Sequence, residues 1–138
     1  MRVADIMTTD VRLLAPEDSI QQAACRMRDE GIGSLPVASG DRLVGYVTDR
    51  DLVVRGLAEG KESSSAISDV MTERILYCFE DESVVEVAKK MAKNQVRRLP
   101  VMTREKRLSG IVSLADLAIK GDDEAAQEAL TQISEPSR

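Results

Sequence analysis

The chain contains an internal duplication, and no other feature constrains its fold as strongly. At an offset of 64 residues two short motifs recur: Asp5–Thr8 as Asp69–Thr72, and Leu35–Val37 as Leu99–Val101. One extra residue between Thr103 and Lys106 raises the offset to 65, which pairs Gly45 with Gly110 and Asp51 with Asp116. An insertion in a turn is the change that a duplicated unit tolerates most easily. The sequence therefore predicts two copies of one unit, at residues 1–60 and 66–121, followed by an acidic tail at 122–138.

Each copy is predicted to run strand, helix, strand, strand, helix, so the fold class is α+β with two β-α-β-β-α repeats. The first helix of each copy carries one apolar stripe at i, i+3, i+4 and i+7: Ile20, Ala23, Ala24 and Met27, then Val84, Val87, Ala88 and Met91. Capping boxes at Ser19 and Ser83 begin these helices, which are expected to end at Gly31 and near Asn94. Neither copy alone buries two helices and three strands comfortably, so the copies should pack as a pair.

The strands are predicted at matching places in the two copies. The first strands are Val11–Leu14 and Ile75–Phe79, and the second strands are Gly33–Ala38 and Arg98–Met102. Each second strand contains a proline, which predicts a sheet edge or irregular pairing. A polar turn then returns the chain into a third strand, making a hairpin. The closing helices start after Thr48 and Ser113 and should end near Gly56 and Gly121.

The acidic tail has two interpretations. Residues Asp122 to Ile133 have a helical composition with acids at the start, and the apolar members are Ala125, Ala129, Leu130 and Ile133. These residues form a weak apolar stripe if the segment is a helix, while the alternative is a frayed acidic tail. Ser134–Arg138 is expected to be disordered.

The Thr48-x-x-Asp51 and Ser113-x-x-Asp116 motifs also have two interpretations. Both have the spacing of a capping box, in which a hydroxyl satisfies a helix N–H and an acid accepts from the preceding backbone. A strand that runs straight into a helix also points amide N–H groups outward, and this arrangement favours anions. The four residues are therefore either helix caps or parts of two phosphate and ribose sites.

Composition excludes several classes of function. The formal charge of -5 argues against nucleic acid as the main partner, because phosphate backbones are bound by clustered Lys and Arg. No apolar run reaches the ~20 residues of a membrane helix, and no signal pattern opens the chain, so a cytoplasmic location is expected. The sequence has no histidine, and Cys25 and Cys78 fit no metal-ligand spacing and are expected to be small core residues. With no catalytic constellation and no metal site, we expect a protein that is not an enzyme.

Taken together, these motifs resemble a known family. An Asp-[Ile/Val]-Met-Thr opening, a Leu-Pro-Val strand and a Gly-x-Val-[Thr/Ser]-x-x-Asp-Leu close, in order and in both copies, are similar to a tandem pair of cystathionine beta-synthase (CBS) domains, often called a Bateman module. The resemblance covers residues 1 to 121. It implies two repeats packed with pseudo-twofold symmetry, with two clefts between them that bind adenine nucleotides or related adenosyl ligands.

The resemblance also implies roles for particular residues. In similar proteins the acid of the closing motif holds the ribose hydroxyls, and the hydroxyl residue contacts ribose or phosphate; here these are Asp51 with Thr48 and Asp116 with Ser113. Residues before Leu-Pro and in the first strand border the base: Ile32, Gly33, Ser34 and Val11 in the first copy, and Val96, Arg97, Arg98 and Ile75 in the second. Strand alternation predicts that Arg97 and Arg98 point to opposite faces, so that at most one lines a given cleft and neutralises a phosphate. The alternative for this pair is a surface ion-pairing couple.

Two functions remain open on this basis. The first is a stand-alone regulatory module that senses AMP, ADP, ATP, NAD or S-adenosylmethionine in one or both clefts and signals to an effector protein by a population shift. The second is a ligand-free homodimeric scaffold, in which the closing-motif residues are only helix caps. A homodimer is expected in either case, because so small a chain gains by burying further apolar helix surface.

Overall fold

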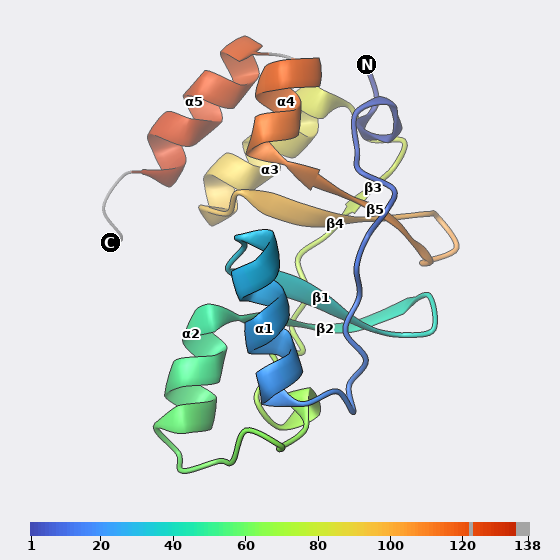
Figure 1. Cartoon of the computed structure of the whole chain (residues 1–138). Helices are drawn as coiled ribbons and strands as arrows, with labels where there is room; N and C mark the ends of the chain where they lie inside the picture. The colour runs from blue at the N-terminus through green and yellow to red at the C-terminus, as the bar shows by residue number, and fades with distance from the viewer. Residues whose placement is uncertain (122, 135–138) are drawn as a thin grey trace. The chain divides into compact units, whose positions relative to one another are not determined.

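A computed structural model describes residues 1–121 and 123–134, and it divides into two compact units (Figure 1). One unit is continuous from Arg12 to Ile75, and we call it the continuous unit. The other joins Met1–Val11 to Leu76–Arg138, and we call it the split unit. The opening segment of each sequence copy therefore packs with the rest of the other copy. The sequence repeats at 1–60 and 66–121 therefore have different boundaries from the two units that pack as compact bodies.

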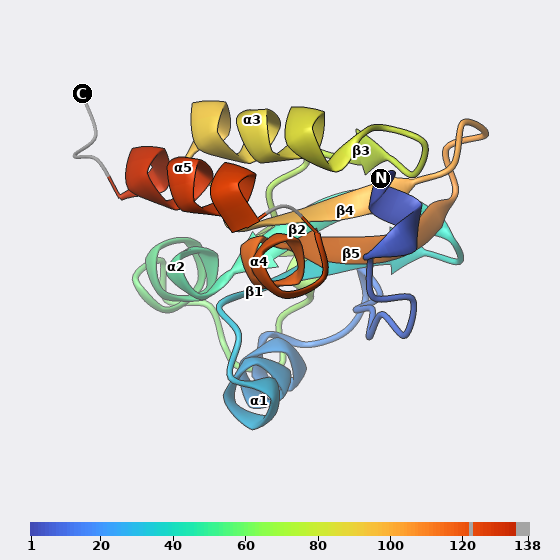
Figure 2. The same ribbon diagram turned by 90° about the horizontal axis from the view of Figure 1, so that it is seen from above.

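The split unit is built on a three-stranded sheet in the order β3-β4-β5. Its strands are β3 (Cys78–Phe79), β4 (Arg98–Met102) and β5 (Leu108–Ser113), and its helices are the 3-10 helix η1 (Val3–Asp5), α3 (Val84–Asn94), α4 (Leu114–Lys120) and α5 (Asp123–Ile133). Strand β4 is parallel to β3 and antiparallel to β5. Figure 2 shows α5 lying alongside α3. The unit's core includes Val3 and Ile6 from the opening segment, at 0% and 2% exposure.

The continuous unit contains a two-stranded antiparallel sheet. Its elements are α1 (Ile20–Glu30), β1 (Ser34–Ser39), β2 (Arg42–Thr48), α2 (Asp49–Asp51), the π-helix η2 (Leu52–Leu57) and the 3-10 helix η3 (Ile67–Asp69). The core includes Ile67 and Val70 of the second copy's opening segment, at 0% and 1% exposure. Apart from the predicted first strands, both units contain helices and strands in the predicted order, and the α+β class with two repeats is confirmed.

The same contact fixes the opening segment in both units. In the split unit, Thr8 and Ile111 exchange two backbone hydrogen bonds of 2.8 and 2.9 Å, and a Cβ added at Gly110 would lie 2.7 Å from Thr8 O. In the continuous unit, Thr72 and Tyr46 exchange the equivalent pair, and a Cβ at Gly45 would lie 2.7 Å from Met71 Sδ. The matched Met-Thr and Gly residues are therefore two sides of one backbone approach, which a side chain would block.

The predicted first strands are mostly wrong. At Val11–Leu14 only Leu14 pairs, in a single parallel bridge to Val37, and Ile75–Phe79 shortens to β3. Leu14 N donates to Pro36 O and Leu14 O accepts from Ala38 N. Extending this parallel ladder toward Arg12 would need an N–H from Pro36, which proline lacks.

Both prolines lie beside irregular pairing, and Pro36 also lies in an edge strand, β1 of the two-stranded sheet. Pro100 lies in β4, the middle strand of its sheet, so the edge alternative is wrong for this copy. The register shifts between Val101 and Met102, and between Val37 and Ala38 in the other unit. Each irregularity thus falls in the hairpin pairing just after a proline.

Helix ends follow the sequence signals closely. Ser19 and Gln22 form the predicted capping box, and Gly31 ends α1 with a left-handed φ of 66°. At α3 the box is incomplete: Ser83 Oγ accepts from Glu86 N at 3.2 Å, and no bond returns from the Glu86 carboxylate. Gln95 takes the left-handed position after α3. The closing helix of the first copy runs one residue past Gly56, as η2.

The tail forms helix α5, which packs against α3 and α4. Its inward residues are Ala126 and Ala129, at 3% and 2% exposure, whereas the predicted stripe member Leu130 is exposed. Ser134 N donates to Leu130 O at the helix end, and residues 135–138 lie outside the described part of the chain. None of the described helices is both long and apolar enough to cross a lipid bilayer.

Candidate functional site

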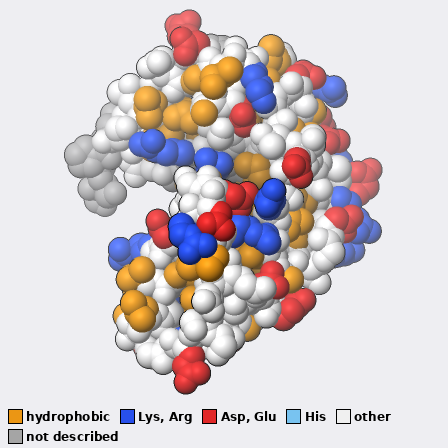
Figure 3. All heavy atoms as spheres, in the orientation of Figure 1, with side chains coloured by type: hydrophobic (Ala, Val, Ile, Leu, Met, Phe, Trp, Pro, Cys, Tyr) orange, Lys and Arg blue, Asp and Glu red, His pale blue; other side chains and the backbone are white. Residues whose placement is uncertain are grey.

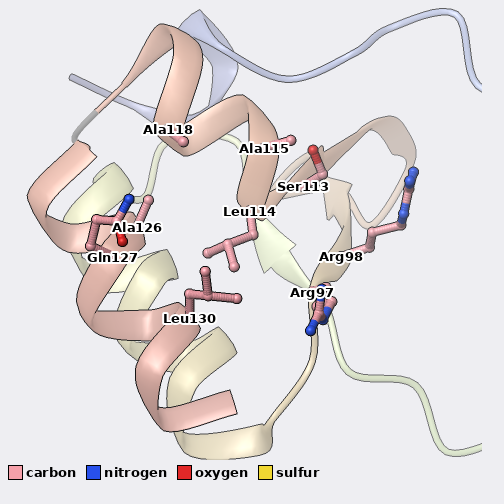
Figure 4. Close-up of a pocket in the computed structure, with 9 residues that line it drawn as sticks. All are labelled: Arg97, Arg98, Ser113, Leu114, Ala115, Ala118, Ala126, Gln127 and Leu130. Carbon is pink, nitrogen blue, oxygen red and sulfur yellow. The ribbon is translucent and has the colours of Figure 1, made fainter. Parts of the chain in front are cut away.

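The split unit contains a pocket of about 350 Å³ where β4, α4 and α5 meet (Figure 4). Its polar lining comes from the starts of β4 and α4 and from one residue of α5, and its apolar lining comes from α4 and α5. The lining residues are Arg97, Arg98, Ser113, Leu114, Ala115, Ala118, Ala126, Gln127 and Leu130. The pocket therefore brings together three of the predicted site residues, Arg97, Arg98 and Ser113.

Arg97 and Arg98 are both among the residues that line this pocket. Strand β4 begins at Arg98, and Arg97 precedes it. The pocket lies within the split unit, so the prediction that at most one of them lines a given cleft stays a prediction. Leu114 N donates to Arg97 O at 2.9 Å, and this bond ties the segment before β4 to the start of α4. In Figure 4 the two side chains leave the chain in different directions from neighbouring positions at the pocket's edge.

Ser113 and Asp116 form a complete capping box at the start of α4. Ser113 Oγ accepts from Asp116 N at 3.1 Å, and Asp116 Oδ2 accepts from Ser113 N at 2.9 Å. Asp116 Oδ1 lies 3.8 Å from Lys120 Nζ, and the carboxyl side chain is 16% exposed. Asp116 is not among the residues that line the pocket, so it faces a different side of α4 from Leu114 and Ala118.

Helix α5 supplies a wall that the sequence analysis missed. Ala126, Gln127 and Leu130 line the pocket, and Gln127 is the polar member of the three. An amphipathic pattern predicted only that one side of this helix would be apolar. No pattern in the sequence indicated that this side would pack beside the start of α4.

The remaining second-copy residues are more dispersed. Val96 N donates to Met91 O at 3.0 Å, and the half-buried Val96 side chain packs against the core of the split unit rather than lining the pocket. Val11 ends the opening segment within the split unit, whereas Ile75 ends the continuous unit. The expected grouping of Val11 with the first copy and Ile75 with the second is therefore reversed in the packing.

In the continuous unit, Thr48 and Asp51 form the equivalent capping box at α2. Thr48 Oγ1 accepts from Asp51 N, and Asp51 Oδ2 accepts from Thr48 N, both at 3.0 Å. Thr72 Oγ1 also lies 3.4 Å from Asp51 Oδ2. Ile32 N donates to Met27 O at the end of α1, and Ile32 packs against the core.

Asp49 is a second residue that the sequence analysis missed. Asp49 N donates to Gly33 O at 2.9 Å, and Asp49 Oδ1 accepts from Arg50 N at 2.8 Å. A Cβ added at Gly33 would lie only 3.0 Å from Asp49 Oδ2, so the carboxylate sits directly over residue 33. Gly33 and Ser34 stand where the second copy has Arg97 and Arg98. The first copy therefore has a carboxylate next to residue 33, where the second copy has a guanidinium on the equivalent residue.

The surface of the molecule carries charges of both signs. On the face drawn in Figure 3, Lys and Arg side chains are interspersed with Asp and Glu. Among the described residues no group of three or more His, Cys, Asp and Glu is placed to hold a metal ion. Cys78 is buried as predicted, whereas Cys25 is only half-buried, because its part of α1 faces away from the core.

The family model for the CBS domain matches residues 3–56 and, independently, residues 67–120. The chain belongs to the CBS domain family. The two matches fall on the two sequence copies, so the protein is a tandem CBS pair, as its motifs predicted.

Two relatives match this CBS pair over nearly their whole length. The uncharacterised protein YlbB of Bacillus subtilis is 45% identical over 137 residues, which are 97% of this chain and 92% of YlbB. Hypoxic response protein 1 of Mycobacterium tuberculosis is 37% identical over 134 residues, 96% of this chain and 93% of that protein.

Solved structures extend the comparison. A crystal structure of Hypoxic Response Protein I with two coordinated zinc ions has a TM-score of 0.77 and 35% identity, covering 87% of this chain and 98% of that protein. The CBS domain pair of protein MJ0100, solved with 5′-methylthioadenosine and S-adenosyl-L-methionine, has a TM-score of 0.71 and 30% identity, covering 86% and 93%. The similarity of fold thus extends to a CBS pair that binds adenosyl compounds.

Proposed function

We propose that this CBS pair is a regulatory module that binds an adenosyl compound and passes a conformational change to an effector protein. The observation that carries the proposal is the pocket in which Arg97 and Arg98 lie beside Ser113. Guanidinium groups form short, charge-assisted hydrogen bonds to phosphate, and their planar geometry suits it better than an ammonium group does. Binding of adenosyl compounds by the CBS pair of MJ0100 supports the same class of ligand.

In this proposal the closing-motif residues act on the ribose. Asp116 uses Oδ2 for the cap, so its Oδ1, which lies 3.8 Å from Lys120 Nζ, is the oxygen proposed for a ribose hydroxyl; Asp51 likewise uses Oδ2 for its cap. Thr48 and Ser113 are the paired hydroxyl contacts. The base is bordered by apolar or backbone groups, for which the candidates remain Ile32, Gly33, Ser34, Val11, Val96 and Ile75. AMP, ADP, ATP, NAD and S-adenosylmethionine share the ribose that these contacts recognise.

Signalling follows from differential binding. A ligand shifts a conformational equilibrium only by the difference between its affinities for the two states. An adenosyl compound that contacts residues of both copies favours one arrangement of them, and the effector protein reads that arrangement. We expect the module to have no catalytic activity of its own and to work in the cytoplasm, where adenine nucleotides are abundant.

Thermal unfolding against a panel of adenosyl compounds tests the proposal. A ligand at 100 times its Kd adds about 2.7 kcal/mol of stability, which raises Tm by several degrees in a domain of this size. We expect at least one compound to raise Tm in the wild type and to lose this effect in Asp51→Ala or Asp116→Ala. Ser83→Ala is the matched control, because it removes a helix cap at α3, away from the pocket. It should cost about 1 kcal/mol and leave the ligand effect intact.

A ligand-free homodimeric scaffold is the second candidate function. It is favoured by the complete capping boxes, which give the closing-motif residues a structural role without any ligand. It is also favoured by η2, which exposes Val53, Val54 and Leu57 at 56%, 43% and 74%. If no compound raises Tm at millimolar concentration while the chain sediments as a dimer, the scaffold is the function and the sensor proposal is wrong.

A further inference from the structure

The two copies differ at the positions that would meet the 5′ end of an adenosyl ligand. Arg97 in the second copy is replaced by Gly33 in the first, and Leu114 is replaced by Asp49. From the second copy to the first, one exchange removes a positive charge and the other adds a negative charge. The second copy therefore presents two guanidinium groups where the first presents a carboxylate.

In the first copy, Asp49 is the first residue of α2, and its carboxylate engages the next backbone amide. Its Oδ1 accepts a hydrogen bond of 2.8 Å from the backbone N–H of Arg50. The equivalent amide in the second copy belongs to Ala115, which lines the open pocket next to Leu114. A leucine side chain cannot accept this hydrogen bond. The residue whose amide is bonded to Asp49 in the first copy thus corresponds to a pocket-lining residue in the second.

The glycine opposite Asp49 is part of the same arrangement. The carboxylate oxygen Oδ2 approaches to 3.0 Å of the position where residue 33 would carry a Cβ, closer than ordinary van der Waals contact. Gly33 does not need a left-handed backbone, because no positive φ occurs there. Its lack of a side chain therefore serves the close approach of Asp49. Gly33 and Asp49 form a matched pair, as Arg97 and Leu114 do in the second copy.

We propose that the two copies select adenosyl ligands by charge. The second copy takes a compound with an anionic 5′-phosphate, and the first takes a compound whose 5′ group is uncharged or cationic, because Asp49 repels a phosphate and occupies its hydrogen-bond donor. This inference rests on the proposed function, since it assumes that both copies hold the ribose of an adenosyl compound. It implies that the module reads two kinds of adenosyl compound at once.

Calorimetric titration of the full chain tests the proposal with two compounds that differ at the 5′ position. AMP carries a phosphate there and 5′-methylthioadenosine carries a neutral thioether. We expect one AMP and two 5′-methylthioadenosine molecules per chain, and one 5′-methylthioadenosine in protein already saturated with AMP. Two equal AMP sites, or a single site shared by both compounds, would overturn the charge selection. If neither compound binds, the charge selection is wrong; if in addition no compound of the thermal-unfolding panel raises Tm, the proposed function itself is wrong, which separates the two failures.

Substitution of Asp49 provides the second arm. Asp49→Asn keeps the size of the side chain and its acceptor oxygen but removes the charge, so we expect AMP affinity at the first copy to rise roughly tenfold or more. The double variant Gly33→Arg with Asp49→Leu copies the second site and should raise it further. Leu114→Asp should abolish AMP binding at the second copy and leave 5′-methylthioadenosine binding in place.

The matched control is Glu59→Gln, which removes one negative charge at an exposed position shortly after η2. It should leave the number of AMP sites at one. If Asp49→Asn and Glu59→Gln change AMP binding equally, only net charge matters and the proposal is wrong. If neither Asp49→Asn nor the double variant creates AMP binding at the first copy, the proposal is also wrong.

Discussion

Cys78 shows how strongly a single buried side chain responds to its surroundings. It is the first residue of β3, has no exposed surface, and lies near the carbonyl of Pro100. Burial, with a smaller contribution from the negative charge of Glu82, raises the pKa of its thiol from 9.0 to about 12. The folded protein therefore keeps this proton over a pH range in which the unfolded chain has lost it.

This pKa shift predicts a loss of stability at high pH. Between about pH 9 and pH 12 the folded state binds one more proton than the unfolded state, so the free energy of unfolding falls by up to about 1.4 kcal/mol per pH unit. Urea denaturation at pH 8, 9.5 and 10.5 measures the slope. In Cys78→Ala this part of the slope should vanish, whereas Cys25→Ala should keep it. Equal slopes in all three proteins would contradict the prediction.

At the scale of elements, the docking of α5 distinguishes the two copies. Ala88 and Ala92 line the groove between α3 and α5, together with Ala125 and Ala129. The first copy has Ala24 and Arg28 at the positions of Ala88 and Ala92. Arg28 is exposed and pairs with Asp29 at 2.9 Å. Small residues on α3 allow close helix packing, and a long charged side chain on α1 does not.

Arginine substitutions at the two equivalent alanines test this reading of α5. Ala88 is 2% exposed, so Ala88→Arg should displace α5 and destabilise the split unit by roughly 1–3 kcal/mol. Ala24 is exposed in α1, so Ala24→Arg should change stability by no more than about 0.5 kcal/mol. Denaturant unfolding gives both values, and limited proteolysis near Gly121 reports release of α5. Similar losses in both variants would show that α5 does not depend on this contact.

Sequence patterns predicted the helices and hairpins far better than the tertiary contacts between them. The capping boxes at Thr48 and Ser113 and the hairpins follow from short-range rules, and the structure contains them. The short pairing at Leu14 could not be foreseen from its apolar neighbours, because it depends on the missing N–H of Pro36 in another strand. The same is true of the site. Arg97 and Ser113 were found from motifs, while Gln127 of α5 and the approach of Asp49 to Gly33 depend on tertiary contacts.

At the scale of the whole molecule, the exchange of opening segments links each copy to the core of the other. Val3 and Ile67 are equivalent in sequence, and each is fully buried. Val3 belongs to the core of the split unit and Ile67 to that of the continuous unit. Each copy's core therefore depends on a residue that the sequence assigns to the other copy.

Truncating these two residues should have crossed effects. Val3→Ala and Ile67→Ala should each cost about 2–4 kcal/mol through lost burial and a residual cavity. Hydrogen exchange should show Val3→Ala weakening protection in α3, β4 and β5, and Ile67→Ala weakening it in α1, β1 and β2. If each variant instead loosened the helices and strands of its own sequence copy, the exchange of segments would be wrong.

The exchange also sets an order of events during synthesis. The continuous unit, Arg12 to Ile75, is complete as soon as its last residue leaves the ribosome. The split unit needs both Met1–Val11 and the segment from Leu76 onward. The contacts between these two segments therefore cannot form until most of the chain has been made. Since domains fold as units while translation proceeds from the N-terminus, the middle of this chain can fold first, while Met1–Val11 stays unpaired until its partners have been made. The duplicated chain is therefore expected to fold its middle segment before its N-terminal one.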